Sequence, residues 1–341
     1  MSSTKSPIVD IHTHVYPPSY ISLLKSRSSI PYIRSFPPSS SLRLVILPAE
    51  DTESSIDISV ISLANPWLDW VPQSEAAKAA QGINDEVNEE CGKFPGRLFA
   101  FGTLPLSGGK EVIVKEIERL KGLKYMRGVI LGTTGLGKGL DDPELLPIFQ
   151  ALQDAKLPIF LHPHYGLPGS VWGERASDYG HVLPLALGFP LETTIAVTRM
   201  ILSGVFEKVP DLEMILAHSG GTLPFLAGRI ESCIEHDAHL KAEGKLGKSR
   251  KTVWDVLKKN IYLDAVVYSE VGLKAAIQAS GEDRVMFGTD HPFFPPLEEE
   301  GAKWASVETN YEAIKGALGS ATPEAQGALG GNAVRVLNLS L

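Results

Sequence analysis

The sequence places two histidines one residue apart near its beginning, in Val9-Asp10-Ile11-His12-Thr13-His14. In an extended strand, residues i and i+2 point to the same side, so His12 and His14 would project together from the end of that strand. Two neutral imidazoles that converge in this way form half of a typical site for Zn²⁺ or a similar cation. The same pair could also be structural or solvated, so the rest of the chain must decide.

Three later apolar segments end at or next to a histidine or an aspartate, side chains that can also bind a metal ion. They finish at His162, at His218 and just before Asp290. In a parallel barrel, catalytic groups come from the carboxyl ends of several strands, because those ends converge on one mouth. Three histidines and one carboxylate drawn from such ends would form a mononuclear metal site with room for a water or a substrate oxygen. Each residue alone could equally be a hydrogen-bonded histidine or a helix-capping aspartate.

Eight short apolar segments rich in β-branched residues alternate with amphipathic stretches of helical length. This pattern predicts buried parallel strands, and a count of eight favours a (β/α)₈ TIM barrel over a doubly wound sheet. The expected strands are residues 8–12, 58–63, 98–102, 127–131, 158–162, 212–218, 261–264 and 284–289. The expected helices are residues 75–94, 110–121, 143–155, 191–206, 223–239, 252–259, 270–279 and 302–318.

The connection between the first two expected strands does not fit this pattern. A parallel crossover needs about a dozen or more residues and usually a helix, whereas residues 48–57 are polar and too few for a packing helix. A short helix is expected only at residues 20–27. We therefore expect a barrel whose first helix is missing or shortened, unless that short helix covers the gap.

Composition restricts the class of protein. The 341 residues are 43% hydrophobic and show no repeat, low-complexity segment or linker, so we expect a single domain over residues 1–341. The net charge of −8 gives no basic field for nucleic acid or an anionic membrane. Two cysteines form no disulfide framework. No targeting segment or uninterrupted membrane-length apolar stretch is visible, so we expect a soluble protein of the cytoplasm.

The motifs together resemble the amidohydrolase superfamily. The resemblance rests on Asp-Ile-His-Thr-His at residues 10–14, on His162, on Ala-His-Ser-Gly-Gly at 217–221 and on Gly-Thr-Asp-His-Pro-Phe at 288–293. Residues 62–67, 189–194 and 224–230 are similar to its decarboxylase branch, typified by aminocarboxymuconate-semialdehyde decarboxylase. Residues 131–140 and 162–168 look like the fungal uracil-5-carboxylate (isoorotate) decarboxylases of thymidine salvage. The resemblance covers nearly the whole chain.

The resemblance implies a set of ligands for a metal ion. Zinc is expected, with manganese as the alternative, and no organic cofactor. His218 would be an acid/base group beside the metal that orients its water or the substrate. The implied ligands are His12, His14, His162 and Asp290.

The resemblance also implies how a small carboxylic acid substrate is bound. Asn65 would hydrogen-bond the substrate ring and Phe293 would pack on it. Arg43 lies where the semialdehyde branch has an arginine for the substrate carboxylate. Arg229 would reach across a homodimer interface to the partner's substrate. Relatives carry a longer segment between Leu47 and Ile58, which in the isoorotate enzymes holds an arginine that grips the carboxylate.

The expected chemistry is loss of CO₂ from an unsaturated ring acid. A divalent ion that binds the carboxylate and an adjacent ring oxygen stabilises charge on that oxygen while the ring is protonated. A general acid must then face the ring, and we prefer Asp290 as the proton carrier with His218 as its orienting partner.

We expect isoorotate as the substrate and uracil as the product. The semialdehyde and phenolic (resorcylate-type) acids are alternative substrates, and a lactonase would use the same ligands. A different class is also open: a shortened, non-catalytic homologue.

Overall fold

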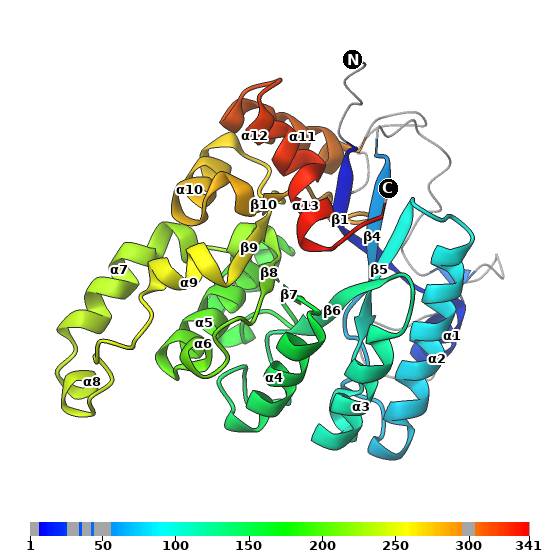
Figure 1. Ribbon diagram of the computed structural model, residues 1–341, viewed down its shortest axis with the longest axis horizontal. Helices are drawn as coiled ribbons and strands as arrows, with labels where there is room; N and C mark the ends of the chain where they lie inside the picture. Colours follow the sequence, from blue (N-terminus) through cyan, green and yellow to red (C-terminus); the bar gives the residue numbers. More distant parts are fainter. Residues whose placement is uncertain (1–6, 26–33, 36–41, 44–55, 295–303, 341) are drawn as a thin grey trace.

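Eight parallel strands form a nearly closed barrel in the computed structural model, which describes residues 7–25, 34–35, 42–43, 56–294 and 304–340 (Figure 1). Neighbouring strands follow chain order from β1 to β10, which confirms the predicted (β/α)₈ topology. The barrel strands are β1 (Val9–Val15), β4 (Ile58–Leu63), β5 (Leu98–Thr103), β6 (Met126–Gly132), β7 (Ile159–His162), β8 (Met214–Leu216), β9 (Ile261–Asp264) and β10 (Val285–Met286).

Helices surround this barrel on the outside (Figure 1). The long ones between β4 and the end of the chain are α2 (Gln73–Gly92), α3 (Lys110–Lys121), α4 (Leu146–Ala155), α5 (Phe189–Leu202), α7 (Leu223–His236), α9 (Val253–Lys259), α10 (Glu270–Ser280) and α11 (Ala305–Leu318). Shorter pieces are η1 (Leu106–Gly108), η2 (Pro143–Leu145), η3 (Gly169–Trp172), η4 (Ala176–Tyr179), η5 (Leu183–Gly188), α6 (Val205–Lys208), η6 (His218–Gly220), α8 (Ala238–Ala242), η7 (Glu282–Arg284), α12 (Pro323–Gln326), η8 (Gly327–Gly331) and α13 (Asn332–Val336).

Two predicted helices are each divided in the structure. The helix expected over residues 191–206 is interrupted after α5, because Gly204 adopts a left-handed backbone with φ of 73° and starts α6 anew. The helix expected over residues 223–239 is interrupted at Asp237, whose extended backbone ends α7 and whose carboxylate accepts the N–H of Leu240 in α8. Both interruptions are local backbone events that apolar periodicity does not register.

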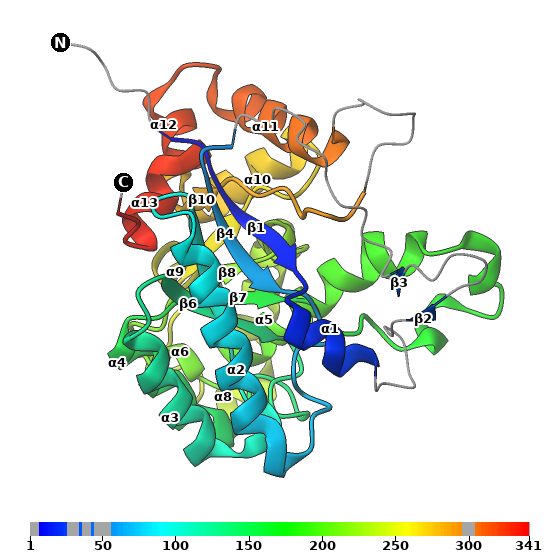
Figure 2. The same ribbon diagram turned by 90° about the vertical axis from the view of Figure 1, so that its right-hand side faces the viewer.

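The first crossover contains α1 (Pro18–Lys25), which confirms a short helix in this region. Tyr20 and Leu24 of α1 are buried, and the Tyr20 hydroxyl donates to the carbonyl of Ala64, just beyond β4. Helix α1 therefore packs at the carboxyl ends of β1 and β4, where Figure 2 shows it beside α2. The two-stranded sheet of β2 (Arg34–Ser35) and β3 (Leu42–Arg43) follows. Residues 44–55 lie outside the described residues, so the shortened segment expected between Leu47 and Ile58 stays a prediction.

Backbone hydrogen bonds rather than a continuous ladder close the barrel between β1 and β10. Ile11 N–H donates to Phe287, and Asp290 N–H donates to the carbonyl of His12. The Asp10 carboxylate adds hydrogen bonds from the N–H and hydroxyl of Thr289, at 3.2 and 2.7 Å. The strand that carries His12 is thereby fixed against the segment that carries Asp290.

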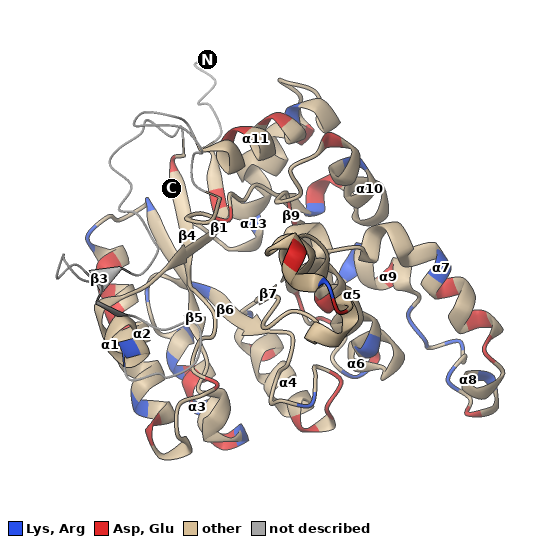
Figure 3. Cartoon of the chain, turned by 180° about the vertical axis from the view of Figure 1, so that it is seen from behind, with Lys and Arg blue, Asp and Glu red and all other residues tan. Residues whose placement is uncertain are grey.

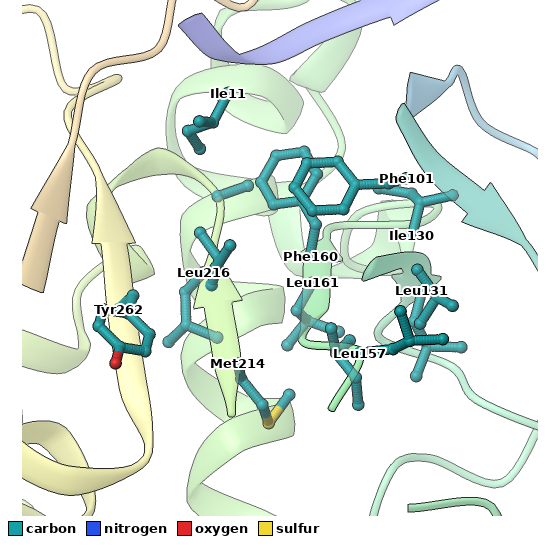
Figure 4. Close-up of a cluster of buried hydrophobic side chains, with 14 of the residues drawn as sticks. Ile11, Phe101, Ile130, Leu131, Leu157, Phe160, Leu161, Met214, Leu216 and Tyr262 are labelled. Carbon is teal, nitrogen blue, oxygen red and sulfur yellow. The ribbon is translucent and has the colours of Figure 1, made fainter. Parts of the chain in front are cut away.

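An aromatic layer fills the barrel beneath its mouth. The ring of Phe160 lies 5.2 Å from that of Phe101 and 5.0 Å from the imidazole of His12, measured between centroids. Figure 4 shows Ile11 close to these two phenylalanines in the interior. Residues i and i+2 of a strand face the same side, so His162 points into the barrel as Phe160 does and lies nearer to the mouth. The layer excludes water from below the histidines.

One apolar stretch on the outside is unusually long. The helical segment Leu183–Leu202 has 20 residues, a mean hydropathy of 1.4 and a most apolar window that is 39% buried, so by length and composition it could cross a membrane. Core helices of soluble proteins meet the same criterion. Here the segment packs on the barrel through one side and exposes Leu185, Leu187, Ile195 and Leu202 on the other.

Candidate metal and catalytic site

Four predicted ligands meet at the carboxyl ends of the strands. His12 and His14 come from β1, His162 ends β7 and Asp290 follows β10, and all four are buried. One ligand atom from each lies within 4.8 Å of all the others. The Nε2 atoms of His12 and His14 are 3.1 Å apart, and Oδ1 of Asp290 lies 3.2 and 3.4 Å from them.

These residues fit a divalent metal ion. Ligand atoms that each lie about 2.1 Å from one ion, at angles near 90–110°, are separated by about 3.0–3.4 Å. The distances between His12, His14 and Asp290 match this separation. Oδ1 of Asp290 is also buried without a hydrogen-bond partner in the described part of the chain. Three imidazoles and one carboxylate suit Zn²⁺, and carboxylate-containing sites also accept Mn²⁺.

The other ring nitrogen of each histidine is already occupied. Nδ1 of His12 lies 2.6 Å from the Asp264 carboxylate, and Nδ1 of His14 lies 3.2 Å from the Ser62 hydroxyl. Nδ1 of His162 donates to the carbonyl of Pro163 at 2.8 Å. Partners on Nδ1 fix the tautomer and the ring orientation, so each Nε2 is left to face the common centre.

The charges of the site favour a bound cation. Burial lowers the pKa of His14, and that of His162 falls well below its usual value, so both rings are neutral as ligation requires. Burial alone would raise the pKa of Asp290, but the neighbouring His12 ring outweighs it and the pKa lies well below the usual range. Burial would likewise lower the pKa of His12, yet Asp290 and Asp264 on either side raise it to about 10. Positive charge is therefore stabilised between these two carboxylates.

His218 lies beside the four ligands, as expected. Its Nε2 is 3.7 Å from Oδ2 of Asp290, and its ring centroid is 5.2 Å from that of His162. Nδ1 of His218 is buried without a hydrogen-bond partner among the described residues. The backbone at His218 and Ser219 is left-handed, with φ of 54° and 51°, which turns the chain sharply at the end of β8. This turn places the imidazole beside the Asp290 carboxylate.

Two of the expected substrate-binding residues also lie at the mouth. Asn65 follows β4, and its Nδ2 donates to the carbonyl of His164 at 2.8 Å. The ring of Phe293 lies 5.5 Å from that of His14. Phe189, which received no role from the sequence, stacks at 6.3 Å on His218. Aromatic rings thus border the metal ligands on two sides.

His164 is buried, and its contacts connect the loops that follow β4, β6 and β7 at the barrel mouth. Its Nε2 lies 3.1 Å from Asp69, its Nδ1 lies 2.5 Å from the Thr134 hydroxyl and its backbone N–H donates to Glu192 at 2.9 Å. The Tyr165 ring stacks on it at 4.0 Å. The carbonyl of His164 accepts a hydrogen bond from the Asn65 side-chain amide, so these contacts also fix the position of Asn65.

The expected roles of the two arginines are not tested by the described part of this chain. Arg229 is exposed on α7, one turn beyond the exposed Phe225. Arg43 belongs to β3, but its side chain lies outside the described residues. Their expected roles therefore stay predictions.

Sequence reasoning missed Asp264, the last residue of β9. Its fully buried carboxylate contacts His12 and the backbone of His218. A carboxylate that ends a barrel strand was the available signal, since the same argument had selected His162 and Asp290.

Fold and site together define a (β/α)₈ barrel enzyme with a mononuclear metal centre at the carboxyl ends of its strands. The chain belongs to the amidohydrolase family, whose model matches residues 9–339.

Similar proteins within this family are named as decarboxylases. A solved structure of IDCase from Metarhizium anisopliae in apo form is 57% identical, with a TM-score of 0.93 over 99% of both chains. The 2-amino-3-carboxymuconate-6-semialdehyde decarboxylase of Dictyostelium discoideum is 31% identical over 85% of this chain and 75% of its own. A gamma-resorcylate decarboxylase of Rhizobium radiobacter is 29% identical over 77% and 80%.

Proposed function

We propose that this protein is a metal-dependent carboxy-lyase that converts uracil-5-carboxylate (isoorotate) to uracil and CO₂. The observation that carries the proposal is the cluster of His12, His14, His162 and Asp290 with His218 beside it. The 57% identity to IDCase, an abbreviation that fits isoorotate decarboxylase, supports the choice of substrate. The reaction would belong to thymidine salvage and take place in the cytoplasm.

His12, His14, His162 and Asp290 would hold a divalent ion, which would supply a Lewis acid for the negative charge of the substrate. We assign zinc to this position, with manganese as the alternative. Asn65 has its Nδ2 engaged by His164, so its amide oxygen is left for an N–H of the substrate ring. Phe293 supplies an apolar face beside His14 for the planar ring.

Proton delivery falls to Asp290 and His218. The low pKa of Asp290, which the neighbouring His12 ring keeps down despite burial, means that the carboxylate must receive a proton before it can donate one. His218, at 3.7 Å, is placed to supply it. The proton goes to the ring carbon that bears the carboxylate, and the carbon–carbon bond then breaks. CO₂ leaves, and the electron pair of the broken bond restores the ring double bond.

The substrate carboxylate also needs a cationic partner, which we assign to Arg229 of a second copy. Phe225 on α7 is 81% exposed, and it adds to the exposed apolar side chains of Leu183–Leu202. An apolar patch of this kind marks an interface more often than a free surface. Figure 3 shows Lys and Arg interspersed with Asp and Glu along the outer helices, α5 and α7 among them. A homodimer through α5 and α7 would cover the patch and place Arg229 at the partner's site.

The deciding experiment is a CO₂-release screen combined with elemental analysis of the purified protein. Isoorotate, 2-amino-3-carboxymuconate-6-semialdehyde and gamma-resorcylate are compared at equal concentration. Release from isoorotate with one equivalent of metal supports the proposal. Release from another acid alone reassigns the substrate, and a ring-opened acid without CO₂ points to a lactonase. A metal-loaded protein that releases CO₂ from none of them is a non-catalytic homologue.

A further inference from the structure

Asp264 makes an unusual number of hydrogen bonds for one buried carboxylate. The side chain has no solvent exposure, and each of its oxygens accepts two N–H groups. Oδ2 accepts from Nδ1 of His12 at 2.6 Å and from the backbone N–H of His218 at 3.1 Å. Oδ1 accepts from the backbone N–H groups of Ser219 and Val266, at 2.7 and 3.1 Å. All of its strong acceptor directions are used.

The first consequence concerns the metal ligand on β1. Oδ2 of Asp264 keeps the proton of His12 on Nδ1, so Nε2 carries the lone pair that faces His14 and Asp290. The contact joins residues 252 positions apart in the chain. It orients the ring from the side opposite to the metal centre.

The second consequence concerns the acid/base histidine. Left-handed backbone at a non-glycine residue is strained and persists only where the surroundings hold it. Both His218 and Ser219 adopt it. Asp264 holds this turn at three points: its carboxylate accepts both N–H groups, and its backbone carbonyl accepts the Ser219 hydroxyl at 2.7 Å.

We propose that Asp264 is a positioning residue that sets His12 and His218 relative to each other, so that metal affinity and proton delivery both depend on one carboxylate. The part that concerns proton delivery rests on the proposed function, and the part that concerns metal affinity does not.

An amide cannot replace this carboxylate. Asparagine offers one acceptor atom and one NH₂ group, whereas four N–H groups face the two oxygens of Asp264. If the amide oxygen faces Ser219 and Val266, the NH₂ group faces His12, and the His12 ring must move its proton to Nε2 to accept from it. With the proton on Nε2, His12 cannot bind the metal through that nitrogen, and the ion keeps only the other three ligands. If the amide is turned the other way, the backbone N–H groups of Ser219 and Val266 lose their acceptor, and the left-handed turn loses one of its three contacts with residue 264.

The test compares Asp264→Asn with Ser219→Ala, which leaves the carboxylate in place and removes only the hydroxyl contact. A matched control is Glu116→Gln, a buried carboxylate that contacts Asn84 and Arg119 on the outer helices. For each variant, Zn²⁺ and Mn²⁺ binding to the metal-stripped protein is titrated, and kcat and KM for isoorotate are measured on the loaded protein.

Asp264→Asn is expected to weaken metal binding by about 10–100-fold, the range for loss of a partner that orients a ligand. Ser219→Ala should leave metal binding within twofold and lower kcat severalfold at nearly constant KM, because only His218 is displaced. Glu116→Gln should match the parent in both readouts. Metal binding by Asp264→Asn within twofold of the parent overturns the proposal.

Folding and function can be separated from this outcome. If circular dichroism shows that Asp264→Asn does not fold, an unchanged kcat in Ser219→Ala overturns the proposal and a reduced kcat with intact metal binding supports it. If the parent releases no CO₂ from isoorotate, the proposed function fails, while the metal titration of Asp264→Asn still decides the role of Asp264.

Discussion

Replacement of Asp290 by asparagine is the sharpest test of the catalytic site. The substitution keeps the size of the side chain but removes a charge that lies 3.2 and 3.4 Å from the Nε2 atoms of His12 and His14. It also removes the proton acceptor that lies 3.7 Å from Nε2 of His218. One change therefore weakens the metal centre and eliminates the proposed proton carrier.

The size of the effect follows from what an amide retains. The amide oxygen can still act as a ligand, so metal binding is weakened rather than abolished. The amide cannot deliver a proton, and a positioned general acid typically contributes about 10²–10⁴-fold to the rate, or roughly 2.7–5.5 kcal/mol of barrier. We expect kcat of the metal-loaded Asp290→Asn protein to fall by at least that lower factor.

The assay measures CO₂ release at saturating metal, with bound metal determined on the same samples. Asp142→Asn is the matched control, because Asp142 is a buried carboxylate that caps a helix and asparagine caps equally well. A metal-loaded Asp290→Asn protein that turns over within tenfold of the parent refutes Asp290 as the proton carrier. If His218→Asn then shows the larger loss, the proton comes from His218 directly.

The other predictions concern the metal, the interface and pH. His12→Ala and His162→Ala should each lose metal and activity together, and stoichiometric zinc in both variants by elemental analysis would contradict the assigned ligands. Arg229→Ala should raise KM by about tenfold or more, the loss of a hydrogen bond to a charged group, without lowering the melting temperature; mixed dimers with an Asp290→Asn subunit should regain activity if the site is shared. Burial lowers the pKa of His14 and His162, so below about pH 6.5 the unfolded chain binds protons that the folded chain does not. The free energy of unfolding of the metal-free protein should therefore decrease as the pH is lowered below about 6.5, by up to about 1.4 kcal/mol per pH unit for each ring. Urea unfolding at pH 7 and at pH 5.5 measures this change, and an equal free energy at both pH values contradicts the prediction.

The sequence predicted the metal cluster because its signals are local. His12 and His14 alternate along one strand, and His162 and Asp290 each stand where an apolar run ends. Chain topology then brings strand ends together without any further information from the side chains. The same logic predicted the place of His218.

The contacts that orient these ligands were beyond sequence reasoning. Asp264 meets His12 across 252 residues, and His164 meets Asn65 across 99. Pairings of this kind depend on rotamers and on turns such as the left-handed backbone at His218. Apolar periodicity contains neither, and a buried histidine such as His164 has the same local pattern as a solvated one.

The contact between the first and last strands implies that metal binding would also stabilise the closure of the barrel. Asp10 and Thr289, 279 residues apart, join the two ends of the barrel by hydrogen bonds, and the ligands stand on opposite sides of that join. An ion shared by His14 and Asp290 would act as a cross-link between residues near the two ends of the chain. The entropic cost of closing a loop grows only slowly with its length, so the great length of this loop adds little to that cost. Capture of the ion would then complete the ring of strands, and the amides of Ile11 and Asp290 would be the first to exchange with solvent when a chelator withdraws it.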